Sequence, residues 1–119
     1  MPEYQLGAIE RRFADLIWDN EPLASRTLVD LAHEALGWKR STTYTILRRL
    51  SDRGLFQNAD GVITSRISRE EFYALQSRAY VEEAFGGSLP RFLAAFSARK
   101  KLDGAEIAAL QALLDQQGR

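Results

Sequence analysis

The sequence predicts a mainly α-helical protein in which three helices, a β-hairpin and then further helices follow one another. Apolar residues recur at steps of three and four over most of the chain, as one buried face of a helix requires. That period changes after Gly54, where two short β-type runs flank the dipeptide Asp60-Gly61, a strong hairpin signal. Residues that cap or stop helices separate the helical stretches.

The first three helices are predicted from their apolar spacing and their ends. The first covers roughly residues 6–18 and ends at Asn20-Glu21-Pro22. Ser25 can cap the second helix, and Gly37 stops it at the usual position for a terminal glycine. The third helix covers roughly residues 41–53. Its inner stripe consists of Thr43, Ile46, Leu47 and Leu50.

The second half of the chain begins with the hairpin, whose strands are predicted at residues 55–59 and 62–67. A capping box at residues 68–71 opens a fourth helix that runs to about Phe85. Ser88 can cap a fifth helix, and Asp103 with Glu106 forms the capping box of a sixth.

Two parts are therefore expected. Residues 1–67 form a winged helix-turn-helix, since a helix–helix–hairpin order with a turn before the third helix is typical of it. Residues 68–119 form a helical tail that cannot surround a core of its own. Small units with unburied apolar stripes usually dimerise, so the tail is predicted to be a homodimerisation region unless it folds back on the first part. The predicted interface consists of Phe72, Leu75, Leu89, Phe92, Leu93, Phe96, Ile107, Leu110, Leu113 and Leu114.

Composition excludes several classes of site. The chain has no cysteine, which excludes a disulfide framework, a thiolate zinc site and a cysteine nucleophile, and it has one histidine. No acid–base constellation is visible, so we expect neither an enzyme nor a metal or other cofactor. No signal peptide begins the chain, and charges interrupt every apolar stretch. A cytoplasmic protein without membrane insertion is expected.

Charge is segregated along the chain although its sum is zero. Residues 38–66 contain six basic and two acidic residues, so this segment carries +4 and the rest carries −4. On the third helix, Ser41, Thr45, Arg48 and Asp52 lie opposite the inner stripe, flanked by Thr42, Tyr44 and Arg49. Short hydroxyl side chains and arginines suit contact with DNA. One alternative is that these arginines form an ordinary solvated helix face. Another is a winged helix that binds a protein, which predicts loss of the basic outer face, whereas Arg48 and Arg49 are present.

Several segments together carry a resemblance to a known family. They are residues 6–10, 17–18, 41–50, 53–54, 86–89, 93–96, 101–102 and 106–110. In their order and spacing, they resemble the BlaI/MecI/CopY penicillinase-repressor family of bacterial transcription repressors. The resemblance implies an N-terminal winged helix, a C-terminal helical dimerisation region and binding of an inverted-repeat operator in a promoter as a homodimer. A membrane-bound sensor protease, with which members often work, is a further expected partner.

The resemblance also implies roles for individual residues. The residues expected to contact DNA bases are Ser41, Thr42, Tyr44, Thr45 and Arg48. The residues expected to contact phosphates are Lys39, Arg40, Arg49, Arg53 and Arg66.

The chain departs from the family in two places. Members that respond to β-lactams are cleaved at an Asn-Phe bond, and the matching pair here is Ala95-Phe96. We therefore expect Phe96 to act as a dimer-core residue. Copper-responsive members bind metal through cysteines that this chain lacks, which excludes copper(I)–thiolate sensing.

Overall fold

The computed structural model describes residues 6–119, which divide by their contacts into two units. The first ends at Ala79 and the second is Tyr80–Arg119. Their boundary falls within helix α4 (Arg69–Phe85). The functional division after residue 67 stays a prediction.

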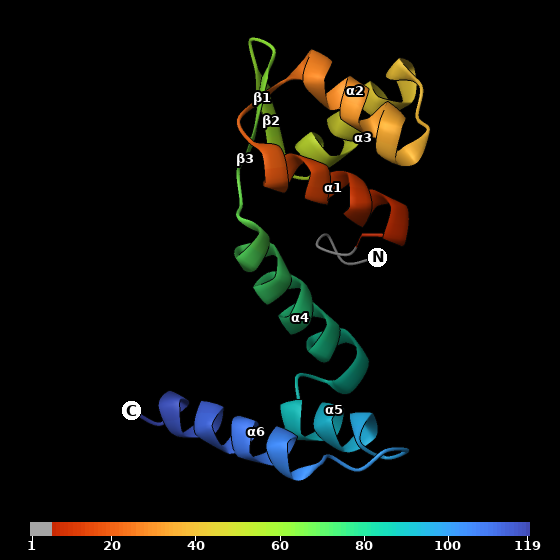
Figure 1. Cartoon of the computed structure of the whole chain (residues 1–119). Helices are drawn as coiled ribbons and strands as arrows, with labels where there is room; N and C mark the ends of the chain where they lie inside the picture. The colour runs from red at the N-terminus through yellow and green to blue at the C-terminus, as the bar shows by residue number, and fades with distance from the viewer. Residues whose placement is uncertain (1–5) are drawn as a thin grey trace. The chain divides into compact units, whose positions relative to one another are not determined.

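The three N-terminal helices are confirmed (Figure 1). They are α1 (Ala8–Asn20), α2 (Ser25–Leu36) and α3 (Arg40–Asp52). Gly37 follows α2 in the left-handed conformation (φ 69°), and its N–H donates to the carbonyl of His33 at 3.0 Å. The predicted cap Ser25 is instead the first residue of α2, preceded by Ala24 as the extended N-cap residue. Its side chain is engaged with Tyr44 of α3.

The hairpin is confirmed and belongs to a three-stranded antiparallel sheet of order β1-β3-β2. Its strands are β2 (Phe56–Ala59) and β3 (Val62–Ser65). Asp60 (φ 54°) and Gly61 (φ 81°) both adopt positive φ, as the two central residues of a type I′ hairpin turn must. The third strand, β1 (Leu23–Ala24), was not predicted, because two residues are too few to show an alternating pattern.

One apolar core holds the first unit together. Helix α1 packs on α2, α2 on α3, and α3 on β2. The buried apolar residues are Leu6, Phe13, Ala14, Ile17, Leu23, Leu28, Ala32, Leu47, Leu50, Leu55, Phe56, Ile63 and Phe72. Full burial of one large apolar side chain contributes roughly 1.5–3 kcal/mol. The positions of α3 and the hairpin are therefore fixed by a shared interior.

The beginning of α4 belongs to this core, which corrects one prediction. Phe72, assigned to the dimer interface, is completely buried, with its ring centroid 5.5 Å from that of Trp18. It leaves no surface for a second chain. Arg69 lies beside it, with its guanidinium carbon 5.6 Å from the centre of the Trp18 ring and ion pairs to Asp15 (3.2 Å) and Asp19 (2.6 Å).

The second unit contains the end of α4, then α5 (Leu89–Phe96) and α6 (Gly104–Gln117). Ser88 caps α5 by accepting the N–H of Arg91 at 3.2 Å. Asp103 and Glu106 form the predicted capping box, each side chain accepting the other's backbone N–H (2.8 and 3.0 Å). The cap signals of both helices are thus confirmed.

Candidate nucleic-acid interface

Helix α3 exposes the side that the sequence pattern assigns to nucleic acid. Thr43, Leu47 and Leu50 are buried along its inner stripe, whereas Ile46 is only half-buried. The residues exposed on its other sides include Ser41, Thr42, Thr45, Arg48 and Arg49. The packing of the inner stripe therefore determines which side chains α3 presents to solvent.

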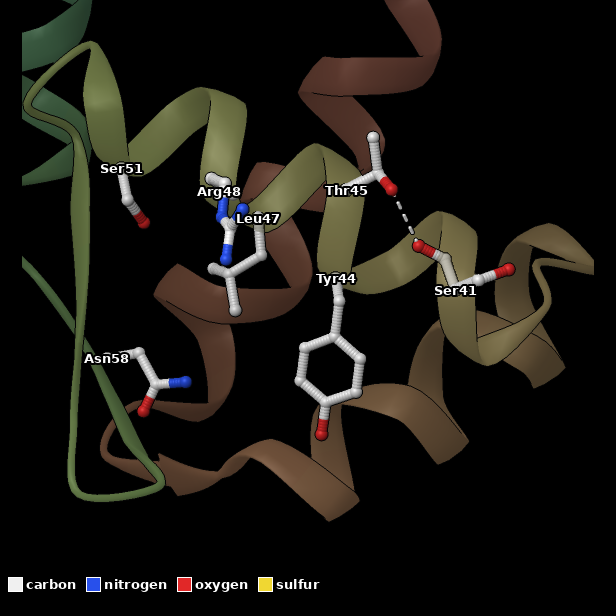
Figure 2. Close-up of a pocket in the computed structure, with 7 residues that line it drawn as sticks. All are labelled: Ser41, Tyr44, Thr45, Leu47, Arg48, Ser51 and Asn58. Atoms are coloured by element: carbon white, nitrogen blue, oxygen red, sulfur yellow. Dashed lines mark hydrogen bonds between the residues drawn. The ribbon is translucent and has the colours of Figure 1, made fainter.

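A hollow of about 720 Å³ lies between α3 and β2 (Figure 2). Its lining residues are Ser41, Tyr44, Thr45, Leu47, Arg48, Ser51 and Asn58. All but one of these side chains are polar or basic, and none is a carboxylate. Such a lining suits a polyanion.

Thr45 lies at the rim of this hollow with its hydroxyl proton already engaged. Its Oγ1 donates to the carbonyl oxygen of Ser41 at 2.9 Å (Figure 2). The hydroxyl oxygen retains acceptor capacity, and the methyl group remains as an apolar contact. Thr45 can therefore accept from a base amino group or touch a thymine methyl.

Tyr44 connects α3 with the beginning of α2. Its half-buried ring packs against the core, and the guanidinium carbon of Arg40 lies 5.8 Å from the ring centre. A side-chain hydrogen bond with Ser25 is the main cause that lowers the pKa of Tyr44 from its ordinary value. The positive charges of Arg40 and Arg26 lower it further, and burial opposes them. A phenol hydroxyl and two cations therefore gather beside the hollow.

The five residues predicted to contact phosphates lie at different places around α3. Lys39 and Arg40 are exposed where α3 begins, Arg53 is half-buried just after its end, and Arg66 is exposed after β3. Arg49 faces α1 and forms an ion pair with Glu10 at 3.7 Å, with 57% of its side chain exposed. None of the five lines the hollow, in which Arg48 is the one cationic lining residue.

Three polar residues near this surface were not predicted to belong to it: Ser25, Arg26 and Asn58. The position of Arg26 could have indicated a role in binding, because a cation in the first turn of a helix opposes the helix dipole, so helix stability does not explain its presence there. No local pattern could have indicated Asn58, since its place opposite α3 depends on how the hairpin packs.

The second unit carries a large exposed apolar surface. None of its residues is fully buried. Tyr80, Phe85, Phe92 and Phe96 form a chain of ring contacts with centroids 5.5–6.2 Å apart. The large apolar side chains that remain exposed in this unit are Tyr80, Leu89, Phe96, Ile107, Leu113 and Leu114. Among the other residues predicted at the interface, Phe92, Leu93 and Leu110 are half-buried, and Leu75 of the first unit is exposed.

Residues 6–119 contain neither a metal-binding cluster nor a membrane-spanning helix. No three or more His, Asp or Glu side chains are grouped in a way that could hold a metal ion. None of the helices in this described range has the length and apolar character needed to cross a membrane.

A family model described as penicillinase repressor matches residues 6–116, which is nearly the whole chain. No curated protein matches the chain.

Proposed function

The chain belongs to the penicillinase repressor family, whose members are DNA-binding transcriptional repressors rather than enzymes, and from this premise we propose its mode of action. It represses transcription by occupying an inverted-repeat operator in a promoter as a homodimer. Each protomer places α3 in the major groove of one half-site. Two protomers then hold two such helices on one face of the duplex, about one helical turn or a multiple of it apart.

The exposed side of α3 is the observation that carries this proposal. Its hydroxyl and arginine side chains are held outward by the buried inner stripe, in a segment with a net charge of +4. The proposed base contacts are Ser41, Thr42, Tyr44, Thr45 and Arg48. The proposed phosphate contacts are Lys39, Arg40, Arg49, Arg53 and Arg66. Release of counterions from the phosphates drives affinity, and the contacts at base edges select the sequence.

Homodimerisation is supported by the apolar surface of the second unit. Leu89, Phe96 and Leu114 are each more than half exposed in one chain. Exposed apolar patches of this kind mark protein interfaces. We propose that the dimer surface consists of Leu75, Leu89, Phe92, Leu93, Phe96, Ile107, Leu110, Leu113 and Leu114.

Binding to promoter DNA tests the proposal. The full chain is titrated by fluorescence anisotropy against the DNA upstream of its own coding sequence, with a scrambled duplex as control and a series of salt concentrations. We expect dimer-stoichiometric binding that is at least roughly a thousandfold tighter than binding to the scramble. Equal weak binding to both duplexes would contradict operator recognition at this promoter. Absence of binding at low salt would favour the alternative, a winged-helix module that binds another protein.

Two further proposals concern the location of the protein and a second partner. Because the proposed target is a chromosomal promoter, we place the protein in the cytoplasm. A membrane-bound sensor protease is a proposed partner. We do not propose cleavage between Ala95 and Phe96, since the first residue differs from that of the cleaved members and both residues lie within α5.

A further inference from the structure

Asn58 of β2 faces the hollow with an amide group of fixed orientation. Its Oδ1 accepts the backbone N–H of Gly61 at 3.0 Å. The amide oxygen is therefore engaged in the hairpin turn, and Nδ2 points from β2 toward the space beside α3 (Figure 2). Nδ2 carries two hydrogens and can only donate. Asn58 thus directs its donor group, and not its amide oxygen, toward whatever occupies the hollow (Figure 2).

The hairpin turn that carries this amide is anchored on both sides. The N–H of Ser25, the first residue of α2, donates to the carbonyl oxygen of Gly61 at 2.8 Å. Strand β3 pairs with β1 as well as with β2, with Ala24 and Ala59 both opposite Val62. Because these contacts hold the turn in place, little conformational entropy remains to be lost when Asn58 binds a ligand.

Arg48 supplies the donors on the other side of the hollow. Its side chain lines the hollow from α3, and it makes no ion pair with any carboxylate in residues 6–119 (Figure 2). Ser41 and Tyr44 belong to the same lining. With no carboxylate among the lining residues, a cation on α3 and an amide donor on β2 enclose a space that favours an anion.

We infer that this hollow seats one phosphodiester group of the DNA backbone, held by Asn58 from the hairpin and Arg48 from α3. The inference rests on the proposed function and adds Asn58 to its contacts. It also changes the proposed contact of Arg48 from a DNA base to a phosphate of the DNA backbone. A base is the poorer occupant, because asparagine reads adenine with its amide oxygen and nitrogen together, and the oxygen of Asn58 is turned toward the N–H of Gly61 and not toward the hollow (Figure 2). Phosphate oxygens accept from amide and guanidinium donors alike.

Two variants on β2 test this inference. Asn58→Asp keeps an oxygen for the N–H of Gly61 but replaces the donor with a negative charge facing the hollow. Gln57→Glu adds the same charge to the neighbouring residue, whose side chain bonds Thr64 at 3.0 Å and lies outside the hollow lining. Successive residues of a strand point to opposite faces, so the pair separates local from global charge effects.

The full-length variants are titrated with a duplex of random sequence at low salt. We expect Asn58→Asp to weaken binding by roughly tenfold or more, and Gln57→Glu by less than about threefold, with thermal midpoints unchanged. Arg48→Gln should lower the salt dependence of log K by about 0.9, the value for one phosphate contact on duplex DNA. It should leave the sequence preference unaltered on any operator that is found.

The outcomes separate the inference from the function on which it rests. If the unaltered protein binds no duplex, both the repressor function and the phosphate seat are overturned. If the unaltered protein binds and the two β2 variants lose affinity equally, the proposed phosphate site is wrong while the proposed function stands. Inorganic phosphate is added as a competitor against chloride of equal ionic strength. Specific inhibition that is absent in Asn58→Asp would support the inference, because free phosphate and the DNA backbone then compete for the same hollow. Inhibition of the same size in both proteins would contradict it.

Discussion

Ser51, near the end of α3, has a hydroxyl oxygen enclosed by protein and without a hydrogen-bond partner among residues 6–119. A buried polar group without a partner destabilises the folded state, and alanine also favours a helix more than serine does. We expect Ser51→Ala to raise the free energy of unfolding by about 1 kcal/mol in urea denaturation. Ser65→Ala is the matched control, because the Ser65 hydroxyl donates to the Glu21 carboxylate at 2.8 Å. Ser65→Ala should lower the free energy of unfolding by about 1–2 kcal/mol. A change of the same sign in both variants would contradict the conclusion that the Ser51 hydroxyl lacks a partner.

Arg49 forms one ion pair and is a proposed phosphate contact, and single substitutions separate the two. Its ion pair with Glu10 is largely exposed, so its loss should change stability by well under about 1 kcal/mol. As a phosphate contact, Arg49→Ala should weaken binding to specific and random DNA alike and reduce the salt slope by about 0.9. Glu10→Gln should tighten binding slightly, since it releases the guanidinium. A changed base preference with an unaltered salt slope would instead show that Arg49 reads bases.

Among the structural elements, the first turn of α4 is attached to α1 by charge and stacking. Arg69 contacts Asp15, Asp19 and the ring of Trp18. Arg69→Ala should lower the free energy of unfolding by about 1–2 kcal/mol, because it removes the two ion pairs and the cation–π contact together. Urea denaturation measures this loss. Arg66→Ala, at an exposed position three residues earlier, is the control, and an equal loss there would refute a specific attachment.

Helices and turns could be predicted because their signals are local. The spacing in α3, the glycine after α2 and the Asp60-Gly61 turn all lie within a few residues of the structure that they determine. Phe72 was misassigned because its pattern indicates an apolar face but not what covers that face. Asn58 was missed for the same reason, since only the packing of the hairpin brings it to α3. Tertiary contacts determine the surroundings of such residues, and a local sequence pattern does not contain information on those contacts.

For the whole molecule, the decisive proposal is association of two chains through the second unit. Phe96 and Leu114 are 64% and 60% exposed, so changing them to glutamate leaves the packing within one chain largely unaltered. We expect the double variant Phe96→Glu with Leu114→Glu to sediment as a monomer and to lose tight operator binding. The exposed polar pair Gln111→Glu with Gln116→Glu matches it in charge. A double variant that stayed dimeric would place the interface elsewhere.

The position of Phe72 in the chain has a consequence for synthesis. Chains leave the ribosome N-terminus first, and domains generally fold in that order. The core of the first unit is complete once Phe72 has emerged, whereas the exposed apolar residues of the second unit are all still to come. We therefore expect the first unit to be folded before its chain can find a partner. Pairing then depends on how many finished chains are present, so operator occupancy should rise more steeply than the amount of protein made.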